Sequence, residues 1–216
     1  GGCPRAYHYR YVQGIKEPTT PAMMQGVSYA KELETYLKGH GDVLSPVTRA
    51  GKHLLPSPGS DLEVECQLGE LGKAVKAREA GESLEVVRQL AGLTAAGIPL
   101  MGAADLRHRR GEYVDEEGVL RRETAQNICE LLDHKTTSRI DDHVSKTGVV
   151  YEGYSKTTEQ VANATQMVGY GVHAAYRYNV SDVRLSHVYY QTKNGHAAAK
   201  RTSLVPVDTL LKRWDR

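Results

Sequence analysis

The chain has 216 residues, of which 40% are hydrophobic and 25% are charged, and its formal net charge is +2. These values are typical of one globular domain and argue against a disordered chain or a fibre. No apolar run approaches the ~18 residues of a membrane span, and no secretory signal pattern opens the chain, so we expect a soluble, cytoplasmic protein with no membrane partner.

The first part of the chain predicts a helix between two less regular segments. Residues 4–17 alternate like a strand, but they also place Tyr7 and Tyr11 one helical turn apart, so periodicity leaves this segment open. After the turn signal EPTTP, five apolar residues recur at helical spacing and predict a helix that Gly39 stops. These five residues are Met23, Val27, Ala30, Leu33 and Leu37.

The middle of the chain predicts strands separated by irregular, polar segments. Residues 62–67 alternate between apolar and polar side chains, as in a half-buried strand. Residues 70–96 are loosely helical and polar, which suggests an insertion. The segment IPLMGAADLRH predicts a strand that ends at or just past Asp105. Residues 109–126 are charged and punctuated by glycine, which suggests a second insertion formed by an exposed hairpin or loop.

The last part of the chain alternates between strand and helix signals. Four elements are expected: a strand over 128–135, one helix over 157–178, a strand over 183–192, and a short strand leading into a terminal helix over 203–214. The full order predicts a single α/β domain over residues 1–216, with a central mixed β-sheet flanked by α-helices.

The segment LLDHKTTS contains an acid and a lysine two residues apart in a predicted strand. Residues at i and i+2 of a strand face the same way, so Asp133 and Lys135 share one face and His134 points to the other. Burying an unpaired charge costs several kcal/mol. A strand that places an acid and a lysine on one face therefore indicates that they have charged partners or a functional role. A simple salt bridge at a strand end is the plain alternative.

Asp105 ends the preceding predicted strand, after the small residues of MGAA. If the two strands are neighbours, Asp105 and Asp133 converge, and two adjacent carboxylates repel unless they share a proton or bind a cation. A hard ion such as Mg²⁺ takes one or two carboxylates and fills its other positions with water and phosphate oxygens. Lys135 beside such an ion could orient the attacking water and offset charge in the transition state.

Four motifs occur in the order found in a known nuclease family. They are CPRAYHYRYV followed by a glycine-led helix, IPLMGAADL, LLDHKTTS, and QMVGY. Together they resemble the PD-(D/E)XK nucleases, and within them the RecB-type branch that includes many phage exonucleases. Each motif is only a hypothesis by itself, and the ordered set is far more specific.

The resemblance implies a restriction-endonuclease-like core and a role for each motif residue. The opening segment would be a helix, Asp105 and Asp133 would be metal ligands, the backbone carbonyl of His134 would be a further ligand, and Lys135 would be the catalytic lysine. Gln166 and Tyr170, one helical turn apart, would face the site and steady Lys135 or the substrate strand. The implied cofactor is Mg²⁺ or Mn²⁺.

The chain departs from the family pattern on its second helix. GVSYAKELE has Ala30 where the branch usually has a metal-binding histidine, and Glu34 matches the glutamate of that pattern. Glu34 is therefore a candidate metal ligand, and a solvated surface acid is the equal alternative. Glu65 is expected to face solvent. Similar nucleases with an iron–sulfur cluster use one early cysteine and three near the carboxyl terminus. This chain has no cysteine after Cys129, and Cys3 alone cannot hold a cluster that needs four thiolates, so no such cluster is expected.

The expected activity is a metal-dependent deoxyribonuclease, an exonuclease in phage or bacterial DNA recombination or processing. A catalytically inactive, nucleic-acid-binding member of the fold is the main alternative, motivated by Ala30. An unrelated α/β domain with accidental motif matches is a third. DNA is the expected partner, a recombinase or helicase on a separate chain is a candidate partner, and a homo-oligomer is a candidate assembly. The residues leave open the strandedness, the polarity and the choice between DNA and RNA.

Overall fold

A computed structural model describes five parts of the chain: residues 20–68, 76–83, 86–87, 102–123 and 127–214. The opening segment 4–17, which the family resemblance makes a helix, lies outside the described residues. So does most of the insertion expected at 70–96.

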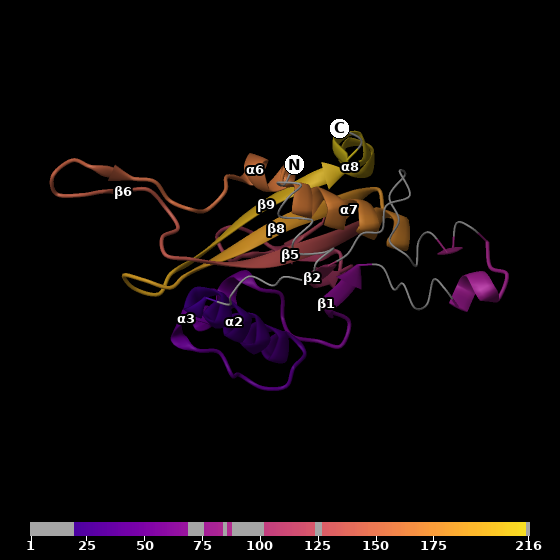
Figure 1. Ribbon diagram of the computed structural model, residues 1–216, viewed down its shortest axis with the longest axis horizontal. Coiled ribbons are helices and arrows are strands. Elements are labelled where there is room, and N and C mark those ends of the chain that lie inside the picture. Colours follow the sequence, from indigo (N-terminus) through magenta and orange to yellow (C-terminus); the bar gives the residue numbers. More distant parts are fainter. Residues whose placement is uncertain (1–19, 69–75, 84–85, 88–101, 124–126, 215–216) are drawn as a thin grey trace.

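A five-stranded sheet forms the centre of the fold (Figure 1). Its strands lie in the order β1 (Glu63–Leu68), β2 (Gly102–His108), β5 (Ile128–Thr137), β8 (Asp182–Gln191) and β9 (Ala198–Pro206). Strands β5 and β8 pair in parallel and every other neighbouring pair is antiparallel. The sheet is therefore mixed, as predicted. Strand β2 continues past Asp105 to His108, so Asp105 lies inside the strand and not at its end.

Helices cover both faces of this sheet (Figure 1). One face carries α2 (Pro21–Leu37), α3 (Pro46–Ala50) and the 3-10 turn η2 (Lys52–Leu54). The other face carries α6 (Thr158–Ala162), α7 (Thr165–Tyr178) and α8 (Val207–Trp214). The predicted α/β class is confirmed.

Two small hairpins extend from this core. Strands β3 (Glu112–Val114) and β4 (Leu120–Arg122) pair within the segment where an exposed hairpin or loop was expected. Strands β6 (His143–Val144) and β7 (Val150–Tyr151) form an arm that projects from the body of the domain (Figure 1). The sequence analysis did not predict this arm.

Helix α2 follows its predicted bounds but buries only part of its predicted face. The Thr20 hydroxyl caps its start by accepting a hydrogen bond from the Met23 amide at 3.2 Å. Leu33 and Leu37 are buried, as expected. Val27 is 70% exposed, contrary to expectation, because the described neighbours of α2 pack against its C-terminal half.

The single helix expected over 157–178 is wrong, because the chain forms two helices there. Thr157 and Gln160 make a reciprocal capping box at the start of α6. The helix then stops at Asn163, and Ala164 takes an extended ψ of 124° before α7 begins. An extended residue breaks the helical hydrogen-bond ladder, and nothing in the apolar periodicity signals it.

Each face of the sheet has its own hydrophobic core. Under α7 the core includes Cys129 and Leu131 of β5, and under α2 it includes Leu132 of the same strand. This alternation is the ordinary period of a strand with two buried faces. By the same period, Asp133 lies on the α7 side and His134 on the α2 side.

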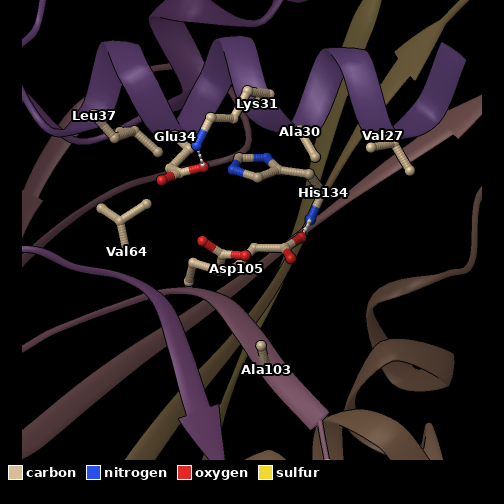
Figure 2. A pocket seen from close by; sticks show the side chains of 10 residues that line it. Val27, Ala30, Lys31, Glu34, Leu37, Val64, Ala103, Asp105 and His134 are labelled. Carbon is tan, nitrogen blue, oxygen red and sulfur yellow. Dashed lines mark hydrogen bonds and ion pairs between the residues drawn. The ribbon is translucent and has the colours of Figure 1, made fainter. Parts of the chain in front are cut away.

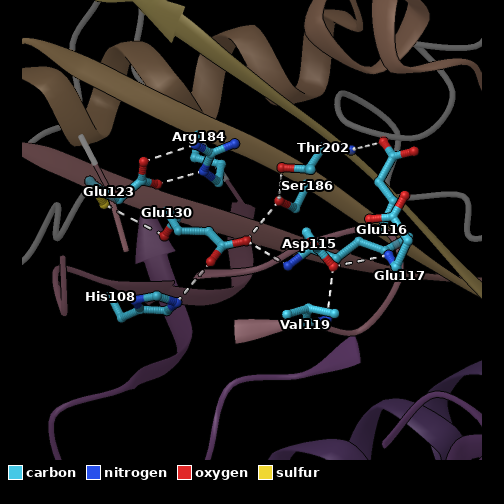
Figure 3. A network of polar contacts seen from close by, with 12 residues as sticks. His108, Asp115, Glu116, Glu117, Val119, Glu123, Glu130, Arg184, Ser186 and Thr202 are labelled. Atoms are coloured by element: carbon cyan, nitrogen blue, oxygen red, sulfur yellow. Dashed lines mark hydrogen bonds and ion pairs between the residues drawn. The ribbon is translucent and has the colours of Figure 1, made fainter. Parts of the chain in front are cut away.

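A buried polar network surrounds Glu130 of β5 (Figure 3). Its Oε1 accepts hydrogen bonds from Lys200 Nζ and from the Ser186 hydroxyl, each at 2.8 Å, and its Oε2 lies 3.0 Å from His108 Nε2. Burial alone would raise the pKa of Glu130, but the Lys200 ammonium and then His108 overcome that effect and lower the pKa to about 2. The Glu130 carboxylate is therefore ionised, and its charge is compensated by partners inside the fold.

We expect Glu130→Ala to lower the free energy of unfolding by about 3–5 kcal/mol, because it leaves Lys200 buried without its anion. The stabilisation that Glu130 supplies should be present at neutral pH and fade as the pH falls from about 4.5 toward about 2, since its folded pKa lies below the unfolded value. Urea unfolding followed by circular dichroism measures both effects. The control is Glu117→Ala at an exposed position, and equal stabilities of the two variants would contradict the expectation.

Candidate active site

The two candidate acids lie where neighbouring strands separate. The pairing of β2 with β5 runs from His108↔Glu130 to Leu106↔Leu132 and stops there. Asp105 and Asp133 are the next residues along the two strands. Strands β2 and β5 are neighbours in the sheet, which was the condition for bringing the two acids close.

The Asp105 side chain forms a hydrogen bond at the point where the backbone pairing of β2 with β5 ends. Its Oδ2 accepts a hydrogen bond from the backbone amide of His134 at 2.7 Å (Figure 2). Without that bond the His134 amide would be a buried donor with no strand partner. Burial raises the pKa of Asp105, and this outweighs the His134 amide and the Lys135 charge, which act in the opposite direction.

At Asp105, strand β2 changes the face of the sheet to which its alternate side chains point. Leu106 belongs to the core under α2, whereas Ala104, two residues earlier on β2, belongs to the core under α7. Residues two apart in a regular strand would share a face. On the paired strand β1, Glu65 has a φ of 56°, a left-handed conformation that is uncommon for residues other than glycine. The reversal of faces on β2 therefore falls at Asp105, opposite Glu65.

Asp133 and Lys135 point to the α7 side, as the two-residue spacing predicted. Lys135 Nζ lies 2.6 Å from Asp133 Oδ2, and it also donates to Gln166 Oε1 at 3.1 Å. Asp133 is buried, with 4% of its side chain exposed, whereas Lys135 is 37% exposed. The pair is thus a buried acid beneath a lysine that reaches solvent.

Helix α7 supplies the amide and the phenol expected from the QMVGY motif. Gln166 Nε2 donates to Asp133 Oδ1 at 3.3 Å and to the Tyr170 hydroxyl at 2.8 Å. The Tyr170 hydroxyl in turn donates to the backbone carbonyl of Ala103 on β2, at 2.9 Å. One helical turn therefore ties Lys135 and Asp133 on β5 to the strand that carries Asp105.

The two acids influence one another electrostatically. Burial raises the pKa of Asp133, the neighbouring Asp105 carboxylate raises it further, and the Lys135 ammonium only partly compensates. Mutual repulsion between nearby carboxylates is relieved by a shared proton or by a cation. A desolvated acid pair beside a lysine is also a common property of functional sites.

Glu34 and the His134 imidazole lie on the α2 side and line a hollow together with Asp105 (Figure 2). The Glu34 carboxylate is held by Lys31 Nζ at 2.7 Å and Lys38 Nζ at 2.5 Å, and these two lysines lower its pKa. The structure thus brings Glu34 near Asp105 but gives its carboxylate two other partners. Glu65 is exposed, as expected, and lines the same hollow.

His187 is a neighbour of the site that the sequence analysis did not single out. It pairs with Asp133 in the parallel register of β5 and β8, and its Nε2 lies 3.8 Å from Asp133 Oδ2. Its Nδ1 lies 2.9 Å from the Tyr189 hydroxyl, and burial lowers its pKa to about 3. No spacing signal marks it, because its position depends on how two distant strands align.

The donors present suit a hard cation better than a metal that needs several protein side chains. No three His, Cys, Asp or Glu side chains among the described residues are grouped to hold a metal ion together. A magnesium-type ion needs only one or two carboxylates, because water and phosphate oxygens complete its octahedron. Asp105 and Asp133 meet that need, and the Oδ2 of Asp133 has no regular hydrogen-bond partner besides its ion pair with Lys135.

Comparisons with known proteins identify no relative: no family model, curated protein or solved structure matches this chain. Among the described residues, no helix has the length and apolar character needed to cross a membrane.

We expect Asp133→Asn to leave the metal-free protein as stable as the native protein or to stabilise it at neutral pH. The change removes a desolvated charge whose raised pKa means that ionisation opposes folding. Any gain should shrink as the pH falls, because the native carboxyl then takes up a proton in the folded state. Thermal unfolding in EDTA across pH 4 to 8 measures this. A clear loss of stability would mean that the Lys135 ion pair dominates instead.

Proposed function

We propose that this protein is a metal-dependent nuclease that hydrolyses phosphodiester bonds in DNA, with a PD-(D/E)XK active site of the RecB type. The observation that carries the proposal is the meeting of Asp105, Asp133, Lys135, Gln166 and Tyr170 from three separate elements. The mixed sheet flanked by helices supports a restriction-endonuclease-like core. An exonuclease role in phage or bacterial DNA recombination belongs to the same proposal.

Asp105, Asp133 and the backbone carbonyl of His134 would hold Mg²⁺ or Mn²⁺ in this site. Such an ion, when bound, polarises the phosphate and lowers the pKa of a water molecule. Asp105 and Asp133 are the first residues past the pairing of β2 with β5, so two neighbouring strands offer a carboxylate at the same end of that pairing. The hydrogen bond from the His134 amide keeps Asp105 in place.

Lys135 is suited to act on the attacking water and on the phosphate. Its ammonium is partly exposed, whereas the acid beneath it is buried, so it can contact a substrate that enters from solvent. Asp105 and Asp133 would hold the cation, which would supply electrostatic stabilisation, and the Lys135 ammonium is placed to face negative charge that develops on the phosphate. Gln166 keeps a hydrogen bond to each member of the pair and acts as a positioning residue.

Binding of nucleic acid without cleavage is the second candidate function. It is favoured by the close ion pair between Lys135 and Asp133, by Ala30 in place of the family histidine, and by the engagement of Glu34 with two lysines. The ion pair competes with a cation for Asp133, and the other two features remove or occupy further ligands that the family pattern would supply. The two candidate functions use the same binding surface, and they differ in whether the bound nucleic acid is cleaved.

End-labelled single- and double-stranded DNA incubated with Mg²⁺ or Mn²⁺ tests the proposal. We expect cleavage by the native protein and a loss of about 10²–10³-fold or more in Asp105→Ala and Lys135→Ala, the range typical of lost transition-state stabilisation. Lys193→Ala, at an exposed position on the turn between β8 and β9, is the matched control and should keep full activity. DNA binding without cleavage by either ion would support the second candidate. Unchanged cleavage by both alanine variants would refute the proposed site.

A further inference from the structure

A hollow of about 330 Å³ opens between α2 and the sheet, next to Asp105 (Figure 2). Most of its exposed wall is apolar and comes from Val27, Ala30, Leu37, Val64 and Ala103. Its polar lining consists of Lys31, Glu34, Glu65, Asp105 and His134. Small-molecule sites are typically concave, about 300–1,000 Å³ in volume, and apolar with a few polar groups. Val27 is 70% exposed, so the described residues leave this wall open to a ligand.

The imidazole of His134 forms part of the wall of this hollow (Figure 2). Its Nδ1 lies 3.3 Å from the Tyr190 hydroxyl, whereas its buried Nε2 has no hydrogen-bond partner among the described residues. The apolar walls and the imidazole ring would accept the flat faces of a ligand, and Lys31 and Glu34 of the same lining offer polar groups to its edge.

The hollow is placed beside the residues proposed to cut the phosphodiester. Asp105 lines it, and a neighbouring hollow of about 250 Å³ shares Ala30 and His134 and reaches Lys135. A phosphate held between Asp105 and Lys135 would have its own nucleoside within reach of these walls. Nucleobases combine flat apolar faces with hydrogen-bonding edges, which is the chemistry that this hollow offers.

We propose that the hollow between α2 and the sheet binds the base of a nucleotide adjoining the scissile phosphate, with the imidazole ring of His134 forming part of the wall that contacts the base. This inference rests on the proposed nuclease function and adds a base-binding subsite to it. The imidazole therefore has a role in substrate binding, separate from the backbone carbonyl of the same residue.

Ala30→Leu tests the subsite by filling it from the wall formed by α2. Leucine is nearly as good a helix former as alanine, and Ala30 is exposed, so the helix should persist. Ser28→Leu is the matched control, because Ser28 is exposed on the same helix and does not line the hollow. Val27→Phe is a second filling variant at an exposed position of the same wall.

The measurement is calorimetric binding of deoxyadenosine 5′-monophosphate and of deoxyribose 5-phosphate, each with Mg²⁺. Neither probe contains a phosphodiester, so binding is measured without turnover. We expect the nucleotide to bind the native protein about tenfold more tightly than the sugar phosphate, since contacts with a base contribute about 1–3 kcal/mol. Ala30→Leu and Val27→Phe should remove this difference, and Ser28→Leu should keep it.

Equal affinities of the two probes for the native protein would overturn the subsite, as would a tenfold difference that survives both filling variants. A different result would refute the nuclease proposal, namely the absence of DNA cleavage with both Mg²⁺ and Mn²⁺. A base-dependent affinity that Ala30→Leu removes, in a protein that does not cleave DNA, would keep the subsite and favour the binding function.

Discussion

The candidate site depends on the hydrogen bond between the His134 amide and the Asp105 carboxylate, 2.7 Å long. Strands β2 and β5 stop pairing just before this point, which would otherwise leave a backbone donor unpaired inside the fold. The side chain replaces the missing ladder bond, so the strands can separate without that penalty. Asp105 and Asp133 are the first residues beyond this pairing, and Lys135 forms an ion pair with Asp133.

Neighbouring strands and helix α7 fix the positions of β2 and β5 where these two strands separate. The parallel pairing of β5 with β8 extends along the whole of β5 and sets His187 beside Asp133. Helix α7 reaches across to β2 through the Tyr170 hydroxyl and the Ala103 carbonyl. Gln166, one turn earlier, spans the Lys135 and Asp133 pair. The positions of the polar groups are thus fixed by long-range contacts on both sides.

Strand β5 carries buried charge in two contrasting environments. At Glu130 the carboxylate meets Lys200, Ser186 and His108, and its pKa falls to about 2. Three residues later at Asp133, burial and the neighbouring Asp105 charge raise the pKa in spite of Lys135. The first environment is matched within the fold and stabilises it. The second leaves negative charge only partly compensated, which suits the binding of a cation.

The sequence by itself determined the local directions: Asp133 and Lys135 on one face of a strand, His134 on the other, and Gln166 with Tyr170 on one helical turn. These follow from the fixed periods of strand and helix, which depend only on neighbouring residues. Tertiary structure decided which groups those side chains contact. Strand pairing placed His187 beside Asp133, the faces of β2 reverse at Asp105, and an extended Ala164 divided the expected helix. Contacts between distant segments depend on register and packing, which periodicity does not encode.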